Sequence, residues 1–284
     1  MEHFQPQQIL CPLDLSPASA AVLSWARLIA EAFSAKVNVL HAEYSEFPRY
    51  FTEGQVQDLA AEERASKHQL QNDVECLARR VLGDRVPYAV TIESGNAVEV
   101  ILAKLRAGNA DIVVMGSHGH SGIARLMMGS VAENVVREAR VPVLIVRGPE
   151  LAPGTRVLRQ VLCSSDLRDG GNCITVAAEI ASRLEAEAQI VHAVETPGPS
   201  ASDEKERLCR LVPDRLKQRC KTVDVLLHGD PAEEVISFAR ANATDLIVVG
   251  VRHRHFLEFS AIGRTTERLM RHSPSSVLLV PESA

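Results

Sequence analysis

Several features that would place the protein in a specialised class are missing from its sequence. The 284 residues contain no run of 18 apolar side chains and no basic start followed by an apolar stretch, so neither a membrane span nor an export signal is predicted. The formal net charge is only -5, which argues against a nucleic-acid or polybasic membrane surface. Six cysteines form no CxxC pair, and Cys11 and Cys163 lie in apolar runs where a reduced thiol acts as a small hydrophobe. We expect a soluble cytoplasmic protein with no nucleic-acid partner and no membrane insertion.

Two familiar phosphate-binding motifs are absent as well. The sequence has no GxxxxGK[ST] stretch, and its first apolar run continues into PLDLS instead of a glycine-rich turn. These absences argue against a Walker-type NTPase and a classical dinucleotide site. An adenylating enzyme of the synthetase type ranks lower still, because no HIGH-like motif is visible.

What the sequence does contain is one domain-sized unit written twice. The run DIVVMG that starts at Asp111 matches the run DLIVVG that starts at Asp245, an offset of 134 residues. The same offset aligns residues 143–146 with residues 277–280. Nearer the N-terminus the offset is 151 to 152, so the second copy is about 17 residues shorter in its middle. A Pro- and Gly-containing segment separates the copies. We therefore expect two domains, residues 1–148 and 155–284, each long enough to bury a core.

The first copy alternates two kinds of apolar pattern. Five short runs have the character of strands buried on both faces: Ile9–Leu13, Lys36–His41, Val86–Ile92, Asp111–Met115 and Val143–Val146. Four segments have helical spacing: Ser19–Phe33, Gln55–Leu82, Ala97–Ala107 and Val131–Glu138. This alternation predicts an α/β fold with a mostly parallel sheet and right-handed crossovers. Such sheets bind ligands beyond the carboxyl ends of their strands, here in the loops after Leu13, His41 and Met115.

The loop after the fourth expected strand reads GSHGHSGIARLMMGSV and has the properties of a phosphate site. Gly116 and Gly119 lack a Cβ, so the chain can take left-handed dihedrals and bring backbone N–H groups against an anion. Gly129 and Ser130 stand directly before a helix, where open N–H groups and the helix dipole favour phosphate. The alternative is an ordinary loop in which Ser130 and Glu133 form a capping box.

Three features together resemble the universal stress protein family: the Asp after the first strand, the His-Ala pair that ends the second, and the G-2x-G-9x-G-S spacing. The resemblance covers both copies and implies two tandem Rossmann-like domains, each a five-stranded mostly parallel sheet flanked by helices. In ATP-binding members the nucleotide lies over the switch point of the sheet. The resemblance implies contacts with base, ribose or metal from Pro12 and Asp14, with adenine from Ala42, with ribose from Gly116, and with phosphates from His118, Gly119, Gly129, Ser130 and Val131.

Some of these residues have a plainer interpretation. Asp14 could cap the following helix instead of contacting a ligand. His118 and His120 form an HxH pair, but zinc normally takes three or four protein ligands, so we predict no metal site and expect solvent-facing loop histidines. A magnesium ion would arrive with ATP, held by phosphate oxygens and a single carboxylate.

The second copy departs from the pattern at the positions that expose backbone amides. His253 stands where the first copy has Gly119, and Arg264 stands where it has Ser130. A side chain at 253 should obstruct the approach of an anion, and a cation at 264 can occupy the volume of phosphates. We expect no ATP in the second copy, while its cluster of Arg and His residues leaves open some other anion.

The sequence supports two functions of different classes. The first is an ATP-binding stress-response or regulatory protein whose nucleotide changes its surface for a protein partner. Phosphoryl transfer needs a positioned base and a charge-neutralising cation, and only His118, His120 and Arg125 are available in the loop, so we expect slow ATP hydrolysis at most and assign no catalytic residue. The second is a nucleotide-free scaffold or dimerisation module. Single-domain members pair through their last strands, so the resemblance implies an intramolecular pseudo-dimer, and a further homodimer stays open.

Overall fold

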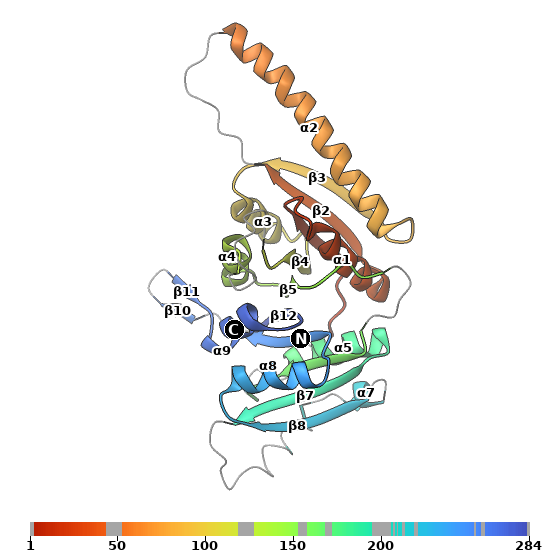
Figure 1. Cartoon of the computed structure of the whole chain (residues 1–284), viewed down its shortest axis with the longest axis vertical. Helices are drawn as coiled ribbons and strands as arrows, with labels where there is room; N and C mark the ends of the chain where they lie inside the picture. The colour runs from red at the N-terminus through yellow and green to blue at the C-terminus, as the bar shows by residue number, and fades with distance from the viewer. Residues whose placement is uncertain are drawn as a thin grey trace.

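The computed structural model shows two α/β halves joined edge to edge (Figure 1). It describes residues 3–43, 53–118, 128–152, 158–167, 172–194, 221–252, 254–256 and 259–282, together with short pieces between residues 206 and 218. We call the described residues up to 152 the first half and those from 158 onward the second half.

The first half contains every element expected from its apolar patterns. In chain order these are β1 (Gln8–Leu13), α1 (Ser19–Phe33), β2 (Lys36–Glu43), α2 (Glu53–Leu82), β3 (Tyr88–Ser94), α3 (Ala97–Arg106), β4 (Ile112–Gly116), α4 (Ser130–Glu138) and β5 (Val143–Val146). The expected boundaries lie within two residues of the observed ones. Helix α2 extends well beyond the sheet at the upper end of the molecule (Figure 1).

The second half repeats this order with one addition. Its elements are β6 (Gln160–Ser164), α5 (Asn172–Leu184), β7 (Glu187–Val194), α7 (Asp214–Lys217), β8 (Thr222–His228), α8 (Pro231–Ala241), β9 (Leu246–Val251), β10 (Arg254–Phe256), β11 (Phe259–Ala261), α9 (Arg264–His272) and β12 (Ser276–Pro281). The addition is an antiparallel pair, β10 with β11, which the sequence did not predict. It occupies the segment that corresponds to the glycine loop of the first copy.

One ten-stranded sheet runs through both halves in the order β3-β2-β1-β4-β5-β12-β9-β6-β7-β8. Pairing is parallel within each half, as expected, and each half has its own 3-2-1-4-5 order. The halves meet where β5 pairs antiparallel with β12, Leu144 lying opposite Leu278. The prediction that these two strands lie side by side at the centre is confirmed.

Asp111 and Asp245, which occupy matching positions in the two copies, have the same structural role. The Asp111 carboxylate accepts hydrogen bonds from the backbone N–H of Gln7 at 2.7 Å and of Gln8 at 2.9 Å. Asp245 holds the start of β6 in the same way, accepting from Arg159 and Gln160 at 2.7 and 3.0 Å. The aspartate that opens each repeated run therefore fixes the start of the strand beside it.

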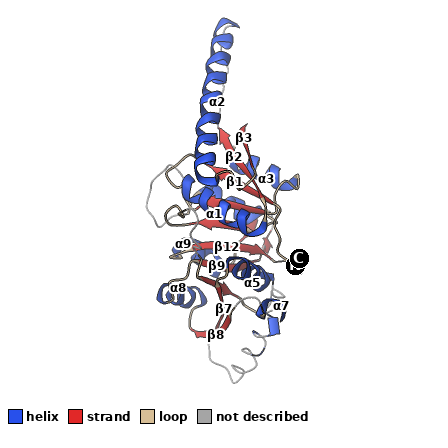
Figure 2. Ribbon diagram, turned by 90° about the vertical axis from the view of Figure 1, so that its right-hand side faces the viewer, coloured by secondary structure: helices blue, strands red, loops and turns tan. Residues whose placement is uncertain are grey.

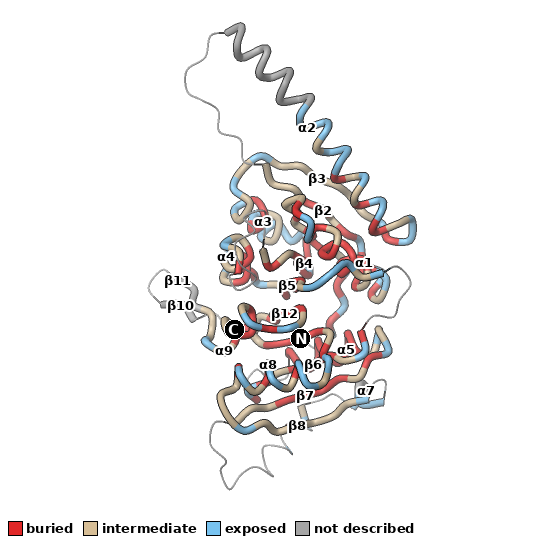
Figure 3. The backbone as a smooth tube through the Cα atoms, viewed as in Figure 1, coloured by how far each residue is buried: buried red, intermediate tan, exposed pale blue. Residues whose placement is uncertain are grey.

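Helices cover both faces of the sheet and enclose two cores that cross the boundary between the halves (Figures 2 and 3). Helices α1, α2 and α5 pack on one face against one set of strand side chains. Helices α3, α4, α8 and α9 pack on the other face against the alternate set. Burial on both faces explains why the central strands read as continuous apolar runs.

Polar contacts reinforce the junction of the halves, which we call the seam. The half-buried Arg147 guanidinium donates to the carbonyl oxygens of Met270 at 2.5 Å and Arg271 at 3.1 Å, at the C-terminal end of α9. Burial lowers the pKa of Arg147. The guanidinium of Arg271 reaches the Glu133 carboxylate of α4 at 3.4 Å. The two halves are thus joined by a strand pair, shared cores and charged contacts.

Candidate functional site

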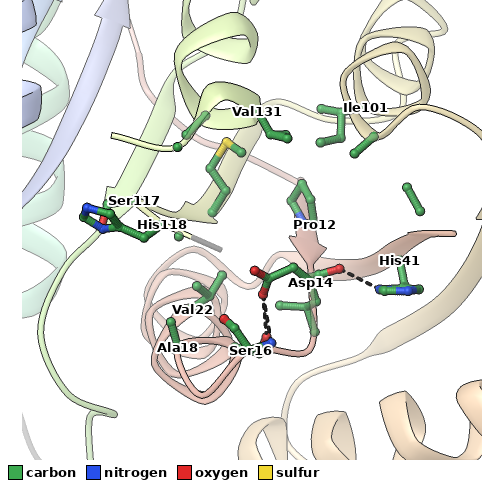
Figure 4. A pocket seen from close by; sticks show the side chains of 18 of the residues that line it. Pro12, Asp14, Ser16, Ala18, Val22, His41, Ile101, Ser117, His118 and Val131 are labelled. Carbon is green, nitrogen blue, oxygen red and sulfur yellow. Dashed lines mark hydrogen bonds between the residues drawn. The ribbon is translucent and has the colours of Figure 1, made fainter. Parts of the chain in front are cut away.

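A cavity of about 390 Å³ opens at the carboxyl ends of β1, β2 and β4, where the strand order predicts a ligand site (Figure 4). Eight of the nine predicted contact residues line it: Pro12, Asp14, Ala42, Gly116, His118, Gly129, Ser130 and Val131. The ninth, Gly119, lies outside the described residues, as do His120, Arg125 and His253. The sequence thus located the walls of the cavity, and a role for these residues in binding stays a prediction.

Asp14 shapes the floor of this cavity by holding the turn that leads into α1. Its Oδ1 accepts from the backbone N–H of Ser16 at 3.0 Å and from the Ser19 hydroxyl at 3.3 Å (Figure 4). Leu15, between them, has a left-handed φ of 61°. Helix α1 has Ala18 at its N-cap and no side-chain cap, so the capping interpretation of Asp14 is wrong in detail. The carboxylate stabilises the preceding turn and also lines the cavity.

In the His-Ala pair at the end of β2, His41 holds two strand ends together and Ala42 lines the cavity. The Nδ1 atom of His41 lies 2.8 Å from the Leu13 carbonyl oxygen (Figure 4). Because a carbonyl oxygen only accepts, Nδ1 must carry the proton. This bond ties the end of β2 to the end of β1, and the small Ala42 that follows lines the cavity. His192 makes the same 2.8 Å bond to Ser165 in the second half.

Gly116 is needed for close approach and not for an unusual backbone. It is absent from the positive-φ glycines, so the expectation of left-handed dihedrals is wrong at this position. A Cβ added here would lie 3.3 Å from the His118 carbonyl oxygen and 3.6 Å from a methyl group of Val22. A side chain would therefore press on the turn that carries His118.

His118 is a wall of the cavity and not a solvent-facing loop histidine. Its Nδ1 lies 2.7 Å from the Ser117 hydroxyl, and the side chain is half-buried. Ser117 is buried and its carbonyl oxygen accepts from the Gly129 N–H at 2.8 Å. The two ends of the glycine loop are thereby held together at the cavity.

The N-terminus of α4 faces the same cavity. Gly129 is its N-cap, with φ −66° and ψ 141°, and no side chain caps it. Ser130 is the first residue inside the helix, so the capping box with Glu133 is wrong. Since no side chain caps this end, N–H groups of the first turn remain for a ligand, and the helix dipole favours an anion there.

Ser16 is a lining residue that the sequence did not single out as a contact. It is only 7% exposed. Its hydroxyl oxygen is buried and has no hydrogen-bond partner among the described residues. Buried polar groups are nearly always satisfied, so an orphaned hydroxyl beside a cavity points to an absent polar partner. The signal in the sequence was faint, because Ser16 follows Asp14 in a stretch that reads equally well as a helix entry.

In the second half, an arginine occupies the place that corresponds to this site. Arg252, the counterpart of His118, donates to the Asp166 carboxylate, and Asp166 is the counterpart of Asp14. Its Nε also lies 2.7 Å from Oε2 of Glu282, at the end of β12. The guanidinium therefore joins the residues that follow β6 and β12 at the place that corresponds to the cavity of the first half. The sequence attributed the difference between the copies to His253 and Arg264, but Arg264 is exposed and Arg252 makes these contacts.

A second substitution strengthens this closure. Thr266 stands where the first half has Ala132, and its buried hydroxyl donates to the Gly250 carbonyl oxygen at 3.3 Å. Ala132 lines the cavity of the first half, so the added hydroxyl and methyl take up space next to the matching glycine. The sequence left open another anion here, and Arg252, one of the cations considered for it, already pairs with two carboxylates.

The described residues contain neither a candidate metal-binding cluster nor a candidate membrane-spanning helix. No group of three or more His, Cys, Asp and Glu side chains is placed to hold a metal ion in that part of the chain. Within the same residues, no helix combines the length and the apolar character needed to cross a bilayer.

Comparison with known proteins agrees with the repeat and the sheet. The profile of the Universal stress protein family matches residues 6–147 and again residues 166–281. The chain belongs to the universal stress protein family. It carries two tandem units of that family with its Rossmann-like fold.

Individual relatives match one unit or both. A universal stress protein of Thermus aquaticus is 31% identical over 140 residues, which are 49% of this chain and 97% of that protein. One from Methanocaldococcus jannaschii is 49% identical, but over 41 residues that span only 24% of its length and 14% of this chain. The crystal structure of a universal stress protein from Archaeoglobus fulgidus superimposes with a TM-score of 0.73 at 20% identity, covering 99% of this chain and 100% of that one. This last likeness shows a shared fold.

Proposed function

We propose that the first half binds ATP together with Mg²⁺, and that the protein acts as a nucleotide-dependent stress-response or regulatory protein. The observation that carries the proposal is the orphaned Ser16 hydroxyl in a cavity onto which an uncapped helix N-terminus opens. A volume of about 390 Å³ lies in the range of small-molecule sites. Resemblance to ATP-binding members of the family makes ATP the ligand of choice.

Each wall of the cavity suits one part of the nucleotide. Ala42, beside the apolar side chains of Leu40 and Ile101, would border the adenine. The first turn of α4 and Gly129 would bind phosphates through backbone N–H groups. Asp14 would serve the ribose or the cation. Bound Mg²⁺ would supply neutralisation of phosphate charge, held mainly by phosphate oxygens.

The site favours binding over turnover. Of the candidate acid-base groups only His118 is described, and its Nδ1 is engaged with the Ser117 hydroxyl. No described carboxylate other than Asp14 lines the cavity, and Asp14 already supports the α1 turn. We therefore propose slow hydrolysis at most, with the bound nucleotide acting through its effect on the surface that a protein partner would meet.

The second half would act as the structural partner of the first. Its last strand completes the sheet at the seam as a second subunit would, so we propose an intramolecular pseudo-dimer of domains 1–148 and 155–284, acting in the cytoplasm. Arg252 leaves this half without a nucleotide. A homodimer of whole chains is a separate question for sedimentation analysis.

Calorimetry of ATP with the full-length chain, stripped of nucleotide, tests the proposal. We expect one ATP per chain and weaker binding when Mg²⁺ is chelated. Identification of an adenine nucleotide in an acid extract of purified protein would support the same conclusion. Absence of binding would favour the nucleotide-free scaffold, and two sites per chain would show that Arg252 does not close the second cleft.

A further inference from the structure

Two thiols lie in contact within the core of the second half. Cys163 belongs to β6 and Cys173 to the first turn of α5, ten positions apart in the sequence. Their Sγ atoms are 3.6 Å apart, and the two residues are 0% and 1% exposed. Neither is in a disulfide.

The first half lacks this pair although it has the same fold. Cys11 corresponds to Cys163, but the counterpart of Cys173 is Ala21 in α1. Cys11 is fully buried, burial raises the pKa of its thiol, and the alanine at the matching place offers no second thiol for a disulfide. The second thiol is thus specific to the half whose cleft is closed by Arg252.

We propose that Cys163 and Cys173 are a reversible thiol modification site, forming an intramolecular disulfide when the protein meets a low-molecular-weight disulfide or a peroxide. The Sγ atoms are in van der Waals contact, and a disulfide bond of about 2.05 Å requires them to approach each other by about 1.5 Å. Cys173 lies in the first turn of a helix, where the dipole favours a thiolate.

With a small disulfide as oxidant the reaction proceeds in two exchanges. The Cys173 thiolate attacks one sulfur of the oxidant and forms a mixed disulfide with it, while the other sulfur leaves as a thiolate and takes up the proton that Cys173 has lost. The Cys163 thiolate then attacks Sγ of Cys173 and displaces the second small thiol. Overall, two protein S–H bonds are lost, one S–S bond forms, and the oxidant is reduced to two thiols.

The position of the pair gives this modification a consequence. The disulfide would close a ring of chain that includes Asp166, the carboxylate that holds Arg252. Oxidation would therefore link β6 covalently to the first turn of α5, with Asp166 between the two bonded cysteines in the chain. This inference does not depend on nucleotide binding by the first half.

Peptide mapping of the oxidised full-length chain tests the proposal. The native protein is incubated with oxidised glutathione over a time course, denatured, alkylated and digested with trypsin, which separates the two thiols by cutting after Arg168. We expect peptides 160–168 and 169–183 to be joined, with the loss of two hydrogen atoms and full reversal by dithiothreitol. The matched control is Cys173→Ala, which installs the residue that the first half carries at this place and should abolish the linked peptide.

Other outcomes would overturn the proposal. Complete alkylation of both cysteines after oxidation would show that the native chain does not form the bond. Glutathione attached to either cysteine without a cross-link, or linkage of either one to Cys76, would show that the two thiols do not react together. If Cys173→Ala lowers stability, Cys173→Ser provides the same chemical test, because a hydroxyl cannot form the bond.

Discussion

Removal of the Ser16 hydroxyl should weaken ATP binding without weakening the fold. The hydroxyl is buried, lines the cavity and has no partner among the described residues, so Ser16→Ala breaks no hydrogen bond of that side chain. The backbone N–H of Ser16 keeps its 3.0 Å bond to Asp14. Burying a polar group without a partner is unfavourable, and stability should therefore stay constant or rise slightly.

The expected loss of affinity follows from the value of one hydrogen bond. A neutral hydrogen bond contributes about 0.5–1.5 kcal/mol net, which corresponds to a roughly two- to twelvefold higher Kd for ATP. A bond from this hydroxyl to a phosphate oxygen would place the effect at the upper end or beyond, because bonds to charged groups are stronger. Calorimetry on nucleotide-stripped protein gives the Kd, and urea unfolding gives the stability.

Ser24→Ala is the matched control because Ser24 is a buried serine of α1, the helix that follows Ser16, and its hydroxyl is fully engaged. It donates to the Ala21 carbonyl oxygen at 2.7 Å and accepts from the Leu151 N–H at 2.9 Å. This change should lower the free energy of unfolding by about 1–3 kcal/mol and leave the Kd unchanged. An unaltered Kd for Ser16→Ala, or a loss of stability like that of Ser24→Ala, would refute the assignment of Ser16 to the ligand.

Three further changes probe the cavity, the seam and a helix cap. Gly116→Ala places a Cβ 3.3 Å from a backbone oxygen, so calorimetry and thermal melting should show weaker ATP binding and about 1 kcal/mol lower stability; unchanged values would disprove the close-approach argument. Arg147→Met keeps the apolar stem but removes two hydrogen bonds from Nη2 to the end of α9, which should lower the free energy of unfolding in urea by about 1–3 kcal/mol; an unchanged value would show that the seam does not depend on them. Asp230 has a lowered pKa, through a backbone hydrogen bond from Glu233 and then through Arg268, so it stabilises the fold above its unfolded pKa, and this contribution is lost as pH falls through the folded pKa. Asp230→Asn should flatten the stability profile below about pH 4, since Asn96 shows that an amide fits the matching cap; an unchanged profile would count against it.

The sequence predicted the elements and their pairing well because both depend on apolar pattern and repetition. Strands that are buried on both faces appear in the sequence as continuous apolar runs. Because the sequence is repeated, the same pattern of runs occurs in both copies and supports the same assignment of strands. The offset of 134 even indicated that β5 and β12 play equivalent roles, and their pairing at Leu144 and Leu278 follows. Secondary structure and burial are properties of whole segments, so the apolar pattern of a segment is enough to predict them.

Properties of single side chains were harder to predict, because they depend on tertiary neighbours. Gly116 was expected to allow a left-handed backbone. Its φ is not positive, and what favours glycine here is the nearby His118 carbonyl oxygen, which a Cβ would approach to 3.3 Å. The alternative interpretation of Ser130 as the cap of α4 is wrong, because Gly129 holds that position. The importance of Arg252 depends on Glu282, which is 30 positions away and lies beside it only after β9 and β12 have paired.

The comparison of the halves shows which identities serve the fold and which differences bear on function. Asp111 and Asp245 each hold the start of a strand, and His41 and His192 each tie two strand ends together. Such matched residues would persist in both halves whether or not either one bound a ligand. A conserved residue within the repeat is therefore weak support for a binding role.

The unmatched positions gather around the two clefts instead. In the alignment of the two copies, His118 corresponds to Arg252, Ala132 to Thr266, and Gly148 to the acidic Glu282. In the second half these side chains make contacts at the matching place: Arg252 pairs with Asp166 and Glu282, and Thr266 donates to the Gly250 carbonyl oxygen. Glutamate could not simply be placed at Gly148, whose φ of 89° favours glycine. The first half thus lacks both the arginine and the carboxylate that close its counterpart, and for that reason its cavity is the one in which a ligand should be sought.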